Sequence, residues 1–196
     1  SGKFPELSQS YEGFHNMVFT EESTVGAFLL RARREGLRDF GACMSPHTAW
    51  LILQGIETLS LRIERHVENA QKVAEWLDKH PQVESVNYAG LKSSKWHKAA
   101  KKYAPKGAGA IVSFEIKGGV TAGARFVDSL NLFSHVANIG DVRSLVIHPA
   151  STTHSQLTPE QQLTSGVTPG LIRLSVGLES VDDLIADLET AFAAAK

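Results

Sequence analysis

The strongest pattern in the chain is a run of apolar residues at helical spacing from Leu53 to Leu77. Apolar residues recur every three or four positions, and acidic and basic residues four apart occupy the other faces. Ser45-Pro46 marks a helix start, because Ser can cap free backbone N–H groups and Pro loses no needed hydrogen bond at the first helical position. Pro81 ends the run. We expect either one long helix or two, with Gly55 and Thr58–Ser60 as weak break signals.

Beyond Pro81 the hydrophobic period changes from that of a helix to that of strands. The alternation predicts strands over 83–88 and 110–117, with shorter strands near 134–138, 144–148 and 171–176. Residues 93–103 are expected as a lysine-rich helix or loop and 120–131 as a helix. The closing helix starts at Ser180, where Ser-x-x-Asp resembles a capping box. Helices interleaved with about five short strands predict an α/β sandwich, with helices on one face of a largely antiparallel sheet.

The segment before Ser45 has weaker patterns. Residues 1–24 are expected to be irregular and extended, and residues 25–38 to form a short helix whose arginines make a solvated face. The single cysteine, Cys43, cannot form an internal disulfide and is expected to be a small buried hydrophobic residue. Because residue 1 is Ser rather than Met, we expect the chain to be a piece of something longer.

Composition excludes several classes of protein. The 196 residues carry 20 basic and 21 acidic side chains, a formal charge of −1, which argues against nucleic acid or an anionic membrane as a partner. The longest strictly apolar run, Ala49–Leu53, is far shorter than the roughly 18 residues of a membrane span. A soluble, cytoplasmic protein is therefore expected.

The segment Asn138–Ser155 is the one stretch whose polar density is unlike core or linker, and it is suited to binding a ligand. His135, His148 and His154 lack other ligands at metal spacing, so no metal site is expected. There is no Gly-x-Ser-x-Gly motif, and the Lys117–Gly119 turn is expected to be only a turn.

Arg173 lies inside an otherwise apolar strand, in the sequence LIRLSV. A guanidinium placed toward the core needs a partner anion to offset its lost hydration, and its planar fork of donors suits a carboxylate. Two alternatives remain: an arginine on the solvent face of the strand, or one paired with an internal Asp.

Three motifs resemble the Cys/Met-metabolism family of pyridoxal-phosphate (PLP) enzymes, of fold type I. They are Asn138–Asp141 (NIGD), His148–Ser155 (HPASTTHS) and Gly170–Glu179 (GLIRLSVGLE). Residues 45–70 also resemble the helix that links the family's large and small domains. Within the family, Ser10–His15 (SYEGFH) is most similar to the O-acetylhomoserine sulfhydrylases.

The resemblance implies the C-terminal small domain of a fold type I enzyme, preceded by a long linking helix. The domains would then be 1–44, the end of the large PLP-binding domain; 45–80, the linking helix or helix pair; and 81–196, the α/β domain. PLP would be bound mainly by an upstream part, because the family's Ser-x-Thr-Lys motif is absent from this chain. The fragment alone would be inactive, and no catalytic residue is assigned to it.

The implied reaction converts O-acetyl-L-homoserine and sulfide, or a thiol, to L-homocysteine, or methionine, and acetate, with PLP as electron sink. Arg173 matches the arginine that binds the substrate α-carboxylate, and Thr153 matches a supporting polar residue. Asn138, which stands where the family's lyases have Ser, is also expected to contact the substrate carboxylate, and Ile147 stands where some relatives have Gln. The full-length enzyme is expected to be a homotetramer. The alternatives are a cystathionine γ-synthase or γ-lyase, a methionine γ-lyase, or a non-catalytic module that binds an amino acid or a partner.

Overall fold

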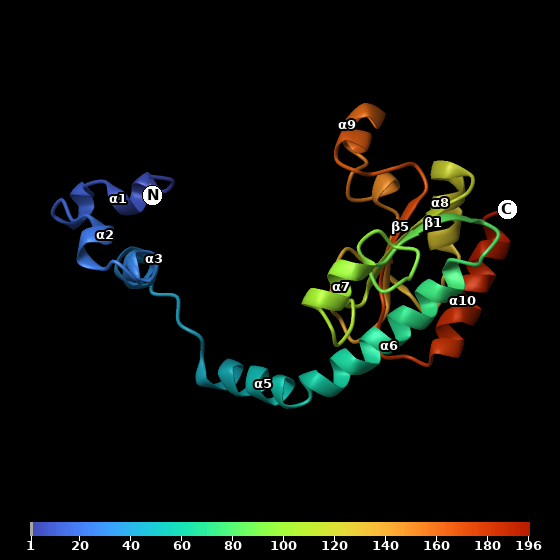
Figure 1. Ribbon diagram of the computed structural model, residues 1–196, viewed down its shortest axis with the longest axis horizontal. Coiled ribbons are helices and arrows are strands. Elements are labelled where there is room, and N and C mark those ends of the chain that lie inside the picture. Colours follow the sequence, from blue (N-terminus) through green and yellow to red (C-terminus); the bar gives the residue numbers. More distant parts are fainter. Residues whose placement is uncertain (1) are drawn as a thin grey trace. The chain divides into compact units, whose positions relative to one another are not determined.

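The computed structural model describes residues 2–196, and the chain divides into two compact units, Ser1–Ile56 and Glu57–Lys196 (Figure 1). Residue 1, which falls in the first range expected from the sequence, lies outside the described residues.

The first unit is built from short helices. They are α1 (Pro5–Ser8), η1 (Glu12–Phe14), α2 (Phe19–Glu22), α3 (Ala27–Arg31), η2 (Ala32–Leu37), α4 (Arg38–Phe40) and α5 (Pro46–Glu57). The expectation of an irregular, extended segment over 1–24 was wrong, since three helical turns lie there. The short helix expected over 25–38 is present as α3, η2 and α4, with a π-helical middle.

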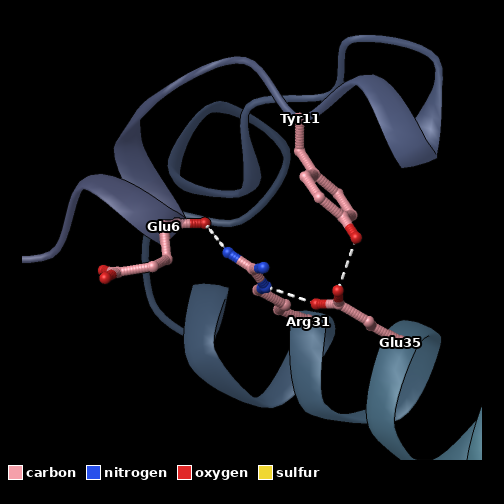
Figure 2. A network of polar contacts seen from close by, with 4 residues as sticks. All are labelled: Glu6, Tyr11, Arg31 and Glu35. Carbon is pink, nitrogen blue, oxygen red and sulfur yellow. Dashed lines mark hydrogen bonds and ion pairs between the residues drawn. The ribbon is translucent and has the colours of Figure 1, made fainter.

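Arg31 joins three parts of this unit (Figure 2). Its Nε donates to Glu35 Oε2 at 2.5 Å, and another guanidinium nitrogen donates to the backbone oxygen of Glu6. Tyr11 donates its hydroxyl to the other Glu35 oxygen at 2.5 Å, and the guanidinium lies 4.7 Å from the Tyr11 ring centre. The expectation that the arginines form only a solvated face was therefore wrong for Arg31, because the aromatic rings and Glu35 hold it in place.

The Arg31 hydrogen bond, followed by that of Tyr11, holds the pKa of Glu35 below its ordinary value of 4.5. A carboxyl group whose pKa is lowered by folding stabilises the fold above its ordinary pKa, and this contribution is lost as the pH falls through the lowered value.

We therefore expect Glu35→Gln to loosen the first unit at pH 7 and to differ little from the wild type at a second, acidic pH below the lowered pKa of Glu35, where Glu35 itself is protonated. The measurement is hydrogen exchange of peptides from residues 5–40 at both pH values. Glu21→Gln, an exposed carboxylate of α2, is the matched control and should leave exchange unchanged at both. If exchange in Glu35→Gln differed from that in the wild type equally at both pH values, ionisation of Glu35 would not be what stabilises the first unit.

Between Ser45 and Pro81 the chain forms two helices, a question that the sequence left open between one helix and two. Ser45 accepts the Thr48 N–H at 3.1 Å and so starts α5, as predicted. The break falls at Thr58, whose side chain makes no capping bond, and α6 (Leu59–Leu77) follows. The second helix therefore begins one residue before Ser60, the cap expected from the sequence.

Much of the apolar surface of α5 is exposed. Trp50, Leu51, Ile52, Leu53 and Ile56 each keep 46–59% of their surface accessible. A helix that is apolar all round is normally buried on all sides in a complete protein. The described residues therefore leave about half of the apolar surface of these five side chains accessible.

Within residues 2–196, five strands form one sheet in the order β1-β2-β5-β4-β3. The strands are β1 (Val83–Asn87), β2 (Ile111–Ile116), β3 (Ser134–His135), β4 (Leu145–Ile147) and β5 (Leu171–Ser175). The β1–β2, β2–β5 and β4–β5 pairs are antiparallel and only β3–β4 is parallel, as expected of a largely antiparallel sheet. The remaining elements are α7 (His97–Tyr103), α8 (Gly119–Asp128), η3 (Pro149–Ser151), α9 (Pro159–Thr164) and α10 (Val181–Ala194).

One face of the sheet is covered by α6, α8 and α10, and Figure 1 shows α6 and α10 lying side by side. Alternate residues of the two central strands face these helices and are almost wholly buried: Val112, Phe114, Ile116, Ile172, Leu174 and Val176. The three helices contribute the matching apolar residues, with Phe126 and Phe192 packed ring to ring at 4.7 Å. The period-two pattern thus sends the intervening residues, Arg173 among them, to the opposite face.

Two expectations about single residues were wrong. Ser180 precedes α10 but makes no side-chain capping bond, so Ser-x-x-Asp does not form a capping box here. Cys43 is exposed rather than buried, because it lies in the extended segment between α4 and α5.

Among the described residues, no helix is both long and apolar enough to cross a membrane.

Candidate substrate-carboxylate site

Arg173 lies at the centre of the sheet. Its strand, β5, runs between β2 and β4, where Ser113 and Ile147 are its direct neighbours across the strands. Its own neighbours in the chain, Ile172 and Leu174, are wholly buried on the helix-covered face. The register of three paired strands therefore fixes the backbone of Arg173, which is half-buried on the opposite face.

The guanidinium is held by one bond and keeps unused donors. One terminal nitrogen donates to the backbone oxygen of Asn138 at 3.0 Å. The Nε atom is buried and has no hydrogen-bond partner among the described residues, which is costly for a buried donor of a charged group. Arg173 has no ion-pair partner among residues 2–196. The alternative of pairing with an internal Asp is thus not realised, and the arrangement fits an external carboxylate.

The loop that follows Asn138 is tied to the same strand. Gly140 donates its N–H to the hydroxyl of Ser175 at 3.1 Å, two residues beyond Arg173 on the same face. Asn138 uses its own side-chain oxygen to accept the Ile139 N–H at 2.9 Å, so its amide is committed locally. It is the backbone of Asn138, rather than its side chain, that meets Arg173. The role of Ser175 was not foreseen, although its place in the alternation with Arg173 was.

A buried polar network supports the end of β5. Glu179 accepts the N–H and the hydroxyl of Ser144 at 2.7 and 2.9 Å, and Ser144 accepts the Gly177 N–H at 2.8 Å. From α6, Asn69 donates to the backbone oxygens of Gly177 and Glu179. His66 is bonded to the Val176 oxygen at 2.6 Å. Polar side chains of α6 thus form hydrogen bonds with the segment Val176–Glu179, which directly follows β5. These bonds fix the end of the strand that carries Arg173.

Gly177 is required by this network for steric reasons. A Cβ atom there would lie 2.4 Å from Glu179 Oε2 and 2.5 Å from both Ser144 N and Val142 O. Two of those atoms are backbone, so the chain itself would have to move.

The hydrogen bonds of His148 and Thr153 go to residues other than Arg173. His148 is wholly buried, with Nε2 bonded to the Pro169 oxygen and Nδ1 to the Ser151 hydroxyl, both at 2.8 Å. Since a carbonyl oxygen only accepts, Nε2 carries the proton and His148 has a structural role. Thr153 is exposed and its hydroxyl is bonded to His154 Nδ1 at 2.8 Å. Residues 2–196 contain no cluster of three or more potential metal ligands.

Neither the hydrogen-bond partner of Arg173 nor its cross-strand neighbours is a lysine. Its hydrogen-bond partner is Asn138 and its cross-strand neighbours are Ser113 and Ile147. A cofactor that reacts through an aldehyde needs a lysine amine, so these residues fit a substrate carboxylate and not the attachment point of PLP. No chemical step through PLP is assigned to them.

The fold is that of part of a fold type I PLP enzyme, as solved structures show. It matches a putative O-acetylhomoserine (thiol)-lyase from Campylobacter jejuni with a TM-score of 0.84 and 44% identity, over 96% of this chain and 45% of that one. That structure carries N'-pyridoxyl-lysine-5'-monophosphate. An O-acetylhomoserine sulfhydrylase of Wolinella succinogenes matches with a TM-score of 0.71 and 36% identity, over 89% of this chain and 46% of that one.

The chain belongs to the Cys/Met metabolism PLP-dependent enzyme family, which it matches over residues 9–193. It is 55% identical to an O-acetyl-L-homoserine sulfhydrylase of Leptospira meyeri, over 97% of this chain and 45% of that protein. It is 51% identical to O-acetyl-L-homoserine sulfhydrylase 1 of Thermus thermophilus, over 98% of this chain and 46% of that protein. A homocysteine synthase of Schizosaccharomyces pombe is 50% identical to it, over 97% of this chain and 44% of that protein. The chain thus spans a little under half the length of these relatives.

We expect Gly177→Ala to lower the free energy of unfolding by about 1–3 kcal/mol, because the added methyl group overpacks the turn against backbone atoms. Urea denaturation followed by circular dichroism measures this loss. Hydrogen exchange at the Gly140 amide should also speed up, since displacing Ser144 and Val142 loosens the loop that Ser175 holds.

The matched control is Gly36→Ala. A Cβ there meets no atom within 4 Å, so the substitution should change stability by no more than about 0.5 kcal/mol. If the two substitutions changed the free energy of unfolding equally, the turn at Gly177 would be shown to accommodate a Cβ atom without steric cost.

Proposed function

We propose that this chain is the substrate-carboxylate-binding part of a PLP-dependent O-acetylhomoserine sulfhydrylase. The whole enzyme would convert O-acetyl-L-homoserine and sulfide, or a thiol, to L-homocysteine, or methionine, and acetate. The observation that carries the proposal is the Arg173 guanidinium, held at the centre of the sheet with a buried, unpartnered Nε. Support comes from relatives that are named as sulfhydrylases and homocysteine synthases.

In this proposal Arg173 binds the α-carboxylate of the amino-acid substrate through its free donors and so orients the bonds to be broken. The backbone of Asn138 holds the guanidinium from one side. Thr153 is assigned a supporting position in the same site. It has no hydrogen bond to Arg173 in this structure, so that assignment rests on the family motif.

PLP, when bound, supplies an electron sink for the substrate's carbon atoms. We infer that its lysine and most of its contacts lie in a part of the enzyme outside these 196 residues. Support comes from the absence of Ser-x-Thr-Lys in the sequence and of any lysine among the hydrogen-bond partner and cross-strand neighbours of Arg173. The exposed apolar surface of α5 also favours a larger enzyme. The isolated chain should therefore be inactive.

A cystathionine γ-synthase or γ-lyase and a methionine γ-lyase would use the same carboxylate contact. The names of the relatives favour the sulfhydrylase, and comparing sulfide with cysteine as acceptor in the full-length enzyme distinguishes them. For the full-length enzyme we also propose a cytoplasmic homotetramer, as the family resemblance implies.

In the full-length enzyme, we expect Arg173→Ala to lower kcat/KM for O-acetyl-L-homoserine, mainly through a higher KM. The decrease should correspond to a loss of about 2–4 kcal/mol of transition-state stabilisation. Arg173→Lys should recover only part of the loss, because an ammonium group lacks the planar fork of donors. Arg125→Ala, an exposed arginine of α8, is the control and should leave both constants near those of the wild type. An unchanged kcat/KM for Arg173→Ala would remove Arg173 from the site.

Mixing the isolated 196-residue chain with PLP should produce no specific lysine adduct and no sulfide-dependent formation of homocysteine. The measurement is the absorbance band of a PLP–lysine imine, followed by borohydride reduction and mass spectrometry of the peptides. A single modified lysine together with turnover would overturn the assignment of the reactive lysine to another part of the enzyme.

A further inference from the structure

A second site candidate lies between α6 and the segment that leads from β1 into α7. The cavity there has a volume of about 600 Å³, within the range of small-molecule sites. Its charged lining residues are Glu75, Asp78, Lys79, Lys92 and Lys101, and His97 also lines it. None of them belongs to the Arg173 site described above.

The walls of this cavity carry opposite charges. Residues 85–114 contain six lysines and no acidic residue, so the α7 side is locally basic although the whole chain is nearly neutral. The α6 side adds Glu75 and Asp78 as well as Lys79. Among the described residues, none of the three lining lysines has an ion-pair partner. The α7 wall therefore offers unpaired cations, and the α6 wall offers two carboxylates beside the unpaired Lys79.

The cavity is built on a rigid turn. Leu91 is 4% exposed and anchors the turn in the core. Tyr88 donates its hydroxyl to the Gly109 oxygen at 2.9 Å, and burial raises the pKa of Tyr88 to about 12, so this donor stays protonated. Gln71 reaches across from α6 and donates to Glu75 at 2.6 Å and more weakly to Gly90 at 3.5 Å. A Cβ at Gly90 would lie 2.3 Å from Gln71 Oε1 and 2.5 Å from the Tyr88 ring, so the present positions of these two side chains depend on glycine there.

His97 supplies an independent sign of a ligand. Its Nδ1 atom is buried and has no hydrogen-bond partner among residues 2–196. The residue lines both this cavity and a smaller one that continues from it. A buried nitrogen without a partner is uncommon in folded proteins and calls for an explanation, of which a polar molecule or ion bound beside it is one.

We propose that this cavity binds a zwitterionic α-amino acid, separately from the substrate site at Arg173. The carboxylate lies on the side of Lys92, Lys101 and His97, and the ammonium group lies on the side of Glu75 and Asp78. A simple anion would meet the two carboxylates of α6 and a simple cation would meet the lysines, so a molecule with both charges fits best. The side chain of the amino acid extends over Leu91. This proposal does not depend on the proposed sulfhydrylase activity.

The test is isothermal titration of the 196-residue chain carrying Arg173→Ala, which removes the other carboxylate site. The probes are L-norleucine, its deaminated analogue hexanoate, its decarboxylated analogue pentylamine, and inorganic phosphate. We expect saturable binding of L-norleucine with a Kd of about 1 mM or tighter, and at least about tenfold weaker binding of the other three.

Two variants locate the binding. Lys101→Ala and Glu75→Gln should each weaken L-norleucine binding by about fivefold or more, through loss of the carboxylate and ammonium partners respectively. Lys98→Ala, an exposed lysine on the same helix that does not line the cavity, is the matched control and should change the Kd by less than about twofold. Circular dichroism confirms that each variant is folded.

Several outcomes would overturn the proposal. They are no saturable binding of L-norleucine up to about 10 mM, equal or tighter binding of hexanoate or phosphate, and equal effects of Lys98→Ala and Lys101→Ala. The second would indicate an anion site, and the third a solvated basic face. Because Arg173 is absent from the protein tested, failure here leaves the proposed function untouched.

Discussion

The structure depends on the pairing of β5 between β2 and β4. All five residues of β5 pair with β2, and Arg173, Leu174 and Ser175 also pair with β4. The alternation of β5 therefore cannot slip without turning Ile172 and Leu174 away from the core. The same constraint places Arg173 on the opposite face. A charged side chain is thus held in position by the apolar residues on either side of it.

The network at the end of β5 extends this constraint to the loop beside Arg173. Glu179, Ser144 and Asn69 come from three separate parts of the chain, and their hydrogen bonds converge on the turn at Gly177. Each polar group is satisfied by another, so the network adds rigidity without leaving a buried group unpaired. The loop that supplies the backbone partner of Arg173 is therefore tied to this network at its Ser144 end.

Two features remain unsatisfied within the described residues, and they point in different directions. The apolar side chains of α5 keep about half of their surface exposed, in a chain that spans under half the length of its relatives. The buried nitrogens of Arg173 and His97 lack hydrogen bonds, and they lie at two separate polar sites. Apolar exposure indicates another part of a protein, whereas an orphaned polar atom indicates a polar ligand.

Sequence alone determined the strands, their two faces and the helix at Ser45, because these depend on local periodicity and capping. It also singled out Arg173, since a charge within an apolar strand stands out. Only the tertiary structure decided that Cys43 is exposed, that Arg31 binds Glu35 and Tyr11, and that Asn138 meets Arg173 through its backbone. Those outcomes depend on segments distant in the chain coming together, which no local pattern records.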